Sequence, residues 1–105
     1  MSNPAKARGS AWERDCARFM DLERMYGAGR HFDVGDLAGD EIVAYECKAA
    51  RAFSLAKWIE EARVEAQNAK KPFGVVVIKR DRLPTKEAYV VMRLEDFRAL
   101  RGLIK

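Results

Sequence analysis

Apolar residues recur at helical spacing in three segments of the chain, which predicts three helices. The first runs from Ser10 to about Tyr26, and a short third one runs from Leu94 to Ile104. The second follows the predicted N-cap Ser54 and ends near Lys70, before a proline. Its expected buried stripe consists of Leu55, Ile59, Ala62, Ala66 and Ala69, with Trp58 at the margin.

Runs of β-branched and aromatic residues, separated by turn-forming residues, predict five strands. They cover residues 30–34, 36–38, 42–48, 73–78 and 88–92. The predicted order is α-β-β-β-α-β-β-α, an α/β fold in which a single layer of mixed sheet is flanked by helices. Residues 1–9 are expected to form a flexible basic arm, and residues 10–105 a single domain.

Composition limits the classes of function. Lys and Arg number 20 against 16 Asp and Glu, a modest surplus that suits a polyanionic partner. Cys16 and Cys47 are too few and too far apart in sequence for a zinc site or a disulfide framework, which favours a reducing cytoplasm. No apolar segment has the length of a membrane span, and no glycine-rich phosphate-binding motif is present. We therefore expect neither a membrane nor a nucleotide cofactor.

The strand at residues 42–48 combines apolar and charged positions. Because side chains alternate between the faces of a strand, Glu46 and Lys48 share one face, and Tyr45 and Cys47 share the other. A carboxylate and an ammonium group on a mostly apolar strand are costly to bury without partners. This face therefore predicts a polar site.

Two aspartates compete to be the partner of Glu46. A two-residue turn at Gly39-Asp40 would place Asp33 opposite Glu46, whereas Asp36 needs a longer loop or a bulge to reach it. An aspartate and a glutamate brought together form a hard-oxygen pocket that suits Mg²⁺. Both aspartates remain open on this argument.

Glu13 has two interpretations. It stands three residues after Ser10, so the pair fits a capping box at the start of the first helix. It also lies at the edge of the apolar stripe, from which a carboxylate can point toward the sheet and its metal pocket.

The spacing of these residues resembles the PD-(D/E)xK nuclease superfamily, and within it the small Holliday-junction resolvases of archaea and phages. Gly35-Asp36-Leu37 followed by Glu46-Cys47-Lys48 is similar to the Asp…Glu-x-Lys signature of that family. Gly9 to Glu13 is similar to its Gly-x-x-x-Glu at the first helix, and Val75 to Arg80 to the strand after its second helix. The resemblance spans nearly the whole chain.

The resemblance implies a restriction-endonuclease-like fold and a role for each matching residue. Asp36 and Glu46 would hold Mg²⁺, for which Mn²⁺ is a plausible substitute, with help from the main-chain carbonyl of Cys47. Lys48 would orient the attacking water and steady the developing charge on the phosphate. Glu13 would assist through a second metal or a bound water. The Gly-Asp-Leu context favours Asp36 over Asp33.

The implied function is a Mg²⁺-dependent, structure-specific endonuclease that hydrolyses phosphodiester bonds in branched DNA, encoded by a bacterium, an archaeon or a phage. Paired incisions would require a homodimer, which would also bury surface of a small domain. The candidate contacts to the DNA backbone are Arg8, Arg51, Lys57, Lys79, Arg80 and Arg82. The alternatives are a nickase, flap nuclease or repair nuclease acting on branched or duplex DNA, and a DNA-binding or assembly module that does not cleave.

Overall fold

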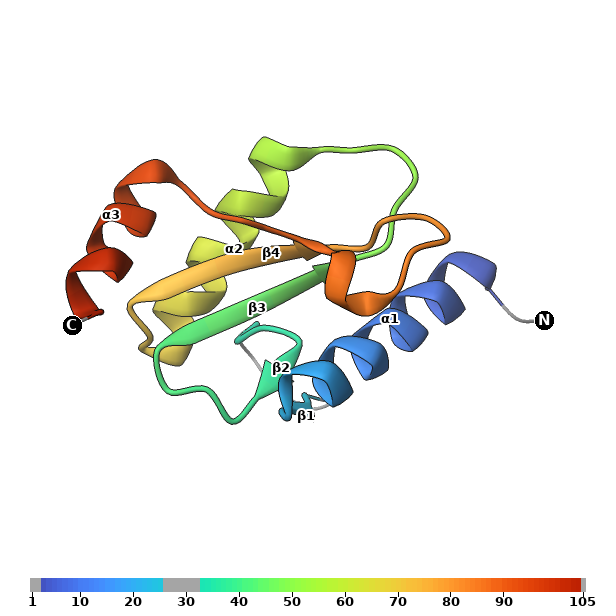
Figure 1. Ribbon diagram of the computed structural model, residues 1–105, viewed down its shortest axis with the longest axis horizontal. Coiled ribbons are helices and arrows are strands. Elements are labelled where there is room, and N and C mark those ends of the chain that lie inside the picture. The colour runs from blue at the N-terminus through green and yellow to red at the C-terminus, as the bar shows by residue number, and fades with distance from the viewer. Residues whose placement is uncertain (1–2, 26–32, 105) are drawn as a thin grey trace.

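The computed structural model describes residues 3–25 and 33–104, which form helices on both faces of a small mixed sheet (Figure 1). The elements in order are α1 (Pro4–Met20), β1 (Glu23–Arg24), β2 (Leu37–Ala38), β3 (Val43–Lys48), α2 (Leu55–Ala69), β4 (Phe73–Ile78), the 3₁₀ turn η1 (Thr85–Glu87), β5 (Tyr89–Val91) and α3 (Leu94–Leu103). The expected α/β class is confirmed. Helices and strands also alternate in the expected order, but the first strand lies at other residues than those predicted. The single sheet is wrong, because β1 and β2 form an antiparallel pair apart from the three-stranded sheet β3-β4-β5.

The first helix begins six residues earlier than the sequence predicted. Asn3 caps it, since its side chain accepts hydrogen bonds from the backbone N–H groups of Ala5 and Lys6, and Pro4 opens the first turn. Residues 4–9 are therefore helical rather than an arm outside the helix. The helix also ends early, at Met20, where Asp21 takes a left-handed conformation with φ 56°.

The strand expected at residues 30–34 is not found where it can be assessed. Residues 33–34 are not in a strand, and residues 30–32 lie outside the described part of the chain. The strand that pairs with β2 is instead β1, at residues that the sequence assigned to the end of the first helix. The expected strands at 42–48, 73–78 and 88–92 are confirmed to within one or two residues.

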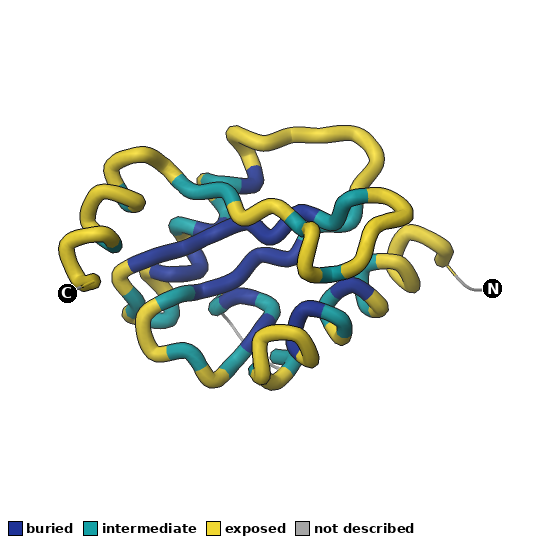
Figure 2. Tube along the Cα trace, in the orientation of Figure 1, coloured by how far each residue is buried: buried dark blue, intermediate teal, exposed yellow. Residues whose placement is uncertain are grey.

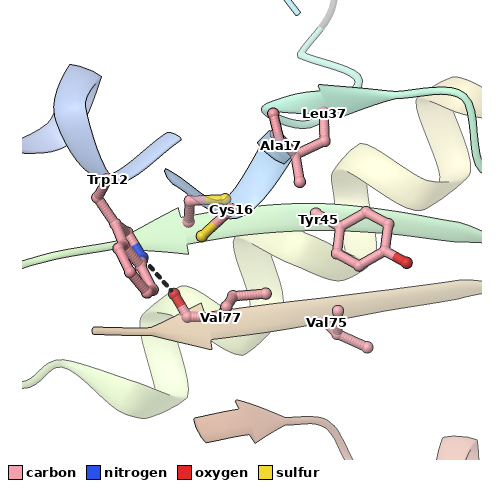
Figure 3. Close-up of a cluster of buried hydrophobic side chains, with 8 residues drawn as sticks. Trp12, Cys16, Ala17, Leu37, Tyr45, Val75 and Val77 are labelled. Carbon is pink, nitrogen blue, oxygen red and sulfur yellow. Dashed lines mark hydrogen bonds between the residues drawn. The ribbon is translucent and has the colours of Figure 1, made fainter. Parts of the chain in front are cut away.

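Strands β3 and β4 run parallel through the centre of the molecule, with Glu46 opposite Val76. All six residues of β4 are buried. Helix α1 covers one face of the pair, where Trp12, Cys16 and Ala17 pack with Leu37, Tyr45, Cys47, Val75 and Val77 (Figure 3). Helix α2 covers the opposite face with Trp58 and Ala62 against Val76 and Ile78. The predicted alternation along β3 is confirmed, since Tyr45 and Cys47 face α1 while Glu46 and Lys48 face α2.

Two polar contacts organise the α1 face. The indole N–H of Trp12 donates to the carbonyl oxygen of Val77 at 3.1 Å, which satisfies the one polar atom of a buried ring (Figure 3). The free thiols of Cys16 and Cys47, distant in sequence, meet here. A hydrogen bond with Cys16 and then burial raise the pKa of the Cys47 thiol.

Helix α3 stands at the end of the sheet away from the N-terminus, and it contains no buried residue (Figure 2). Leu94, Phe97 and Leu103 are exposed, with Leu94 at 82% and Phe97 at 47%. Among the described helices, none combines the length and the apolar character needed to cross a membrane.

We predict that Gly74→Ala destabilises the fold by about 3 kcal/mol, because overpacking a rigid contact forces the backbone to move. A Cβ atom at Gly74 would lie 2.1 Å from the carbonyl oxygen of Ala62, so α2 and β4 could no longer approach as they do. Chemical denaturation measures the loss.

Gly102→Ala is the matched control. A Cβ atom at Gly102 meets nothing within 4 Å, and alanine favours the helical backbone of α3. This variant should gain about 0.5–1 kcal/mol. Equal stability of the two variants would contradict the close approach of α2.

Candidate functional site

Three carboxylates meet between β3, α2 and the segment before β2. Glu46 of β3 and Glu65 of α2 are 8% and 1% exposed. With Asp33 they form the carboxylate trio, in which one oxygen from each residue lies within 4.8 Å of the other two. Neither oxygen of Glu65 receives a hydrogen bond from any described residue. A buried carboxylate whose neighbours are carboxylates is stable only when it binds a proton or lies next to a cation.

Local backbone geometry holds Asp33 in this position. Its side chain accepts a hydrogen bond from the N–H of Gly35 at 3.0 Å, and its carbonyl accepts one from the side chain of Asn68 on α2 at 2.9 Å. Gly35 has φ 101°, and a Cβ atom there would lie 3.1 Å from the carbonyl oxygen of Tyr45. Glycine therefore lets the chain turn while passing close over β3.

Asp36 is bound to the edge of β3 that does not pair with β4. Its carboxylate accepts the N–H of Cys47 at 2.7 Å, and its own N–H donates to the carbonyl of Tyr45 at 2.8 Å. Since the N–H and C=O groups of one strand residue point the same way, the Cys47 carbonyl lies on this edge too. The loop between β2 and β3 is the longer connection that Asp36 needed, and Asp40 closes it by accepting the N–H groups of Ile42 and Val43.

Electrostatics shows how strongly these acids interact. Burial, followed by the charge of Glu46, raises the pKa of Asp36 to about 8, against the opposing hydrogen bond from Cys47. Burial also raises the pKa of Glu65 to about 11, with further contributions from Glu46 and Asp33. The structure thus brings both candidate aspartates to Glu46, so the choice between Asp33 and Asp36 is not exclusive.

Lys48 supplies the positive charge on this face. Its Nζ lies 3.7 Å from Glu46 and 3.2 Å from Glu61 of α2. Burial opposes its charge, but the carboxylates of Glu46, Glu61 and Asp36 outweigh burial and raise its pKa. Lys48 is therefore a cation at neutral pH, suited to bind an anion or orient a water but not to act as a base.

Glu13 is not part of a capping box, because Ser10 lies inside α1 rather than at its start. Glu13 pairs with Arg24 of β1 at 3.0 Å, and Arg24 also donates to the hydroxyl of Ser10 at 3.1 Å. The charge of Glu13 contributes to the raised pKa of Asp36, so it lies near the site. Its catalytic role stays a prediction.

The six candidate DNA contacts divide into two groups. Arg8, Arg51, Lys79 and Arg80 line a single cavity. Lys57, exposed on α2, is not among the residues that line it. Arg82 is also outside the lining, with a side chain 92% exposed and 3.9 Å from Asp81.

The sequence did not identify Glu65, which lies outside the buried stripe predicted for the second helix. The predicted stripe was rotated, since Leu55 is exposed and the buried residues of α2 are Trp58, Ala62, Glu65 and Ala66. Helical spacing carried a signal, because position 65 lies seven residues after Trp58 and three after Ala62. Gln67 is exposed, as expected.

Comparisons of the chain with models of protein families, with curated proteins and with solved structures found no match. The chemistry of the described residues is therefore the structural basis for any function. Their central feature is the carboxylate trio with Asp36 and Lys48 beside it.

We predict that stability in EDTA falls as the pH rises from about 5 to 8. The folded chain keeps protons on Asp36 and Glu65 that the unfolded chain releases at ordinary carboxyl pKa values, so raising the pH favours unfolding. Each such group contributes a slope of up to about 1.4 kcal/mol per pH unit. Glu65→Gln should reduce the slope and stabilise the protein by about 1–2 kcal/mol at pH 8, because its amide can donate to the neighbouring carboxylates.

Glu60→Gln is the control on the same helix, since Glu60 is exposed and only pairs with Arg63. It should change stability by less than about 0.5 kcal/mol. Urea titrations at both pH values make the measurement. A Glu65→Gln protein less stable than wild type at pH 8 would show that the buried charge is already neutralised by other means.

Proposed function

We propose that this protein is a Mg²⁺-dependent endonuclease with a restriction-endonuclease-like fold, which hydrolyses phosphodiester bonds in branched DNA. The observation that carries the proposal is Glu65, which is buried with neither oxygen hydrogen-bonded by a described residue, beside Glu46 and Asp33. Together with Glu46 and the exposed Asp33, Glu65 would supply the oxygen ligands that a hard divalent cation prefers. Mn²⁺ would be accepted as a substitute.

The spacing of the carboxylate trio is close to that of a bound cation's ligands. Two oxygens bound to one Mg²⁺ lie at most about 4.2 Å apart, twice the usual Mg–O distance of about 2.1 Å. The oxygens of the trio lie within 4.8 Å of one another, so small side-chain movements would complete the site. Asp36 and the carbonyl of Cys47, at the edge of β3, offer further oxygens next to Glu46.

The surrounding residues support phosphodiester hydrolysis. A bound Mg²⁺ would polarise a phosphate oxygen and lower the pKa of a bound water. The ammonium of Lys48, held by Glu46 and Glu61, would orient the attacking water and stabilise negative charge on the phosphate. Asp36 would fix the water through the oxygen that does not accept from Cys47. Glu13, held by Arg24, adds negative charge near Asp36.

The choice of branched DNA depends on the resemblance to junction resolvases, and it brings a homodimer with it. With one carboxylate trio among residues 3–25 and 33–104, the chain would make paired incisions only as two copies. The exposed apolar side chains of α3 give a second copy a surface to cover. A nickase on the same site would work as a monomer, so light scattering at the concentration of the cleavage assay separates these two candidates.

Glu46→Gln and Lys48→Ala should each lower cleavage of a four-way junction at least about 10³-fold while leaving DNA affinity within about twofold. Both side chains belong to the reacting site, whereas affinity comes from dispersed phosphate contacts. Cleavage is measured on junction, flap, nicked and duplex DNA with Mg²⁺, and binding is measured with Ca²⁺ or EDTA.

Glu60→Gln and Lys86→Ala are the matched controls, because Glu60 on α2 and Lys86 on η1 are both exposed and neither is a candidate contact to the DNA. They should cleave like wild type. Full activity of either site variant would contradict the nuclease proposal, and loss of binding together with cleavage would mean that the variant had lost its fold or its DNA surface.

Asp33→Asn and Asp36→Asn should act on different steps. Asp33 belongs to the trio, so its loss should raise the Mg²⁺ concentration for half-maximal cleavage by about 10–100-fold. Asp36 accepts the Cys47 N–H at the edge of β3, so its loss should lower the rate at saturating Mg²⁺. Mg²⁺ titration of both variants tests this, and an unchanged Mg²⁺ requirement in Asp33→Asn would rule out the trio as the cation site.

A further inference from the structure

A cavity of about 760 Å³ opens where the parallel strands β3 and β4 end. The segments that follow these strands, residues 49–51 and 79–81, line it together with residues from the first half of α1. In open α/β sheets, ligands commonly bind outside the carboxyl ends of the strands. We call this feature the strand-end cavity.

Charge gives the first indication of its ligand. Four cations line the strand-end cavity, namely Arg8, Arg51, Lys79 and Arg80, against two acids, Asp15 and Asp81. Within residues 3–25 and 33–104, none of the four cations forms an ion pair with a carboxylate. They come from three separate parts of the chain, so the fold gathers them at one opening. This arrangement favours a ligand with more than one negative charge.

Exposed aromatic rings give the second indication. Phe53 and Tyr89 line the cavity and are 60% and 52% exposed, although both are large apolar side chains. Both rings are held in place. The guanidinium of Arg80 lies 4.5 Å from the centre of the Tyr89 ring, and the ring of Phe53 lies 5.5 Å from that of Trp58.

One part of the cavity lining is the buried indole ring of Trp12. Trp12 is 2% exposed and is fixed by its hydrogen bond to the carbonyl of Val77. The Nζ atom of Lys79 lies 5.9 Å from the centre of its ring. The lining of the cavity therefore combines a hydrogen-bonded indole ring, two exposed aromatic rings and four cations.

We propose that the strand-end cavity binds an unpaired nucleotide within a DNA strand, with its base stacked on Phe53 or Tyr89 and its flanking phosphates at the four cations. Stacking on aromatic rings combined with a basic groove is how proteins bind single strands without sequence preference. Bases inside a duplex are covered by their neighbours and offer no free face. The cavity should therefore bind unpaired DNA segments more tightly than duplex DNA.

The strand-end cavity adjoins the candidate site. Phe53 packs on Trp58, and the Nζ atom of Lys48 lies 5.7 Å from the centre of that same indole ring. A strand held in the cavity would thus lead its next phosphates toward Lys48. Binding of the single strand needs neither a metal cation nor cleavage. It is therefore a property separate from the proposed hydrolysis, and it can be tested where no hydrolysis occurs.

The experiment measures binding of the full chain in EDTA to a labelled oligothymidylate and to a duplex of the same length. Wild type should bind the single strand at least about tenfold more tightly at equal salt. Phe53→Ala and Tyr89→Ala should each weaken single-strand binding about tenfold and leave duplex binding within about twofold. Tyr89→Phe keeps the ring and should keep the affinity.

Two controls match these variants. Phe19→Ala removes an exposed ring of α1 that does not line the cavity, and it should leave binding of both DNAs unchanged. Arg51→Ala should weaken binding and lower the slope of log affinity against log salt by about one, whereas Arg18→Ala, an exposed residue of α1 outside the cavity, should not. Thermal melting followed by circular dichroism confirms that each variant is folded.

Three results would overturn the proposal. The first is wild-type affinity in both Phe53→Ala and Tyr89→Ala, and the second is an equal loss for single strand and duplex, which would mean phosphate contacts alone. The third concerns competition for the bound, labelled oligothymidylate. If free thymidine monophosphate displaces it at the same concentration as an unlabelled oligothymidylate does, the cavity is a pocket for free nucleotides. If the nuclease proposal fails instead, wild type binds single strands as described and cleaves nothing.

Discussion

Helix α2 approaches strand β4 so closely that only a glycine fits at position 74, against the carbonyl of Ala62. This contact sets how deeply the helix lies on the sheet. Glu65, three residues after Ala62, therefore lies close to Glu46. Asn68, on the next turn of α2, donates a hydrogen bond to the backbone carbonyl of Asp33. The assembly of the acids is thus a consequence of helix packing. The energy of that packing offsets the cost of burying carboxyl groups beside one another, and the raised pKa values of Glu65 and Asp36 keep these two groups protonated when folded.

The parts of the site that depend on local geometry could be predicted from the sequence. Alternation along β3 places Glu46 and Lys48 on one face whatever the rest of the chain does, and this was confirmed. The orientation of α2 could not be predicted in the same way. Counting apolar residues ranks Leu55 above Glu65 as a buried position, whereas the structure buries the face that contains Trp58 and fits against Gly74.

Competition between equivalent local signals explains the other differences. Asn3 followed by Pro4 and Ser10 followed by Glu13 both fit the start of a helix, and the first pair forms the cap. Ser10 and Glu13 then bind Arg24, a partner eleven or more residues away that no local rule identifies. The specific nuclease fold and function depend on the resemblance and stay predictions.

The two tryptophans of the chain lie on opposite faces of the sheet, Trp12 on α1 and Trp58 on α2. Each is almost fully buried and has a lysine ammonium near its ring, Lys79 for Trp12 and Lys48 for Trp58. The protein therefore carries two intrinsic fluorophores, one in the lining of the strand-end cavity and one beside the acidic site. Replacing either with phenylalanine would leave emission from a single face, so that events at the two regions could be followed separately and without a label.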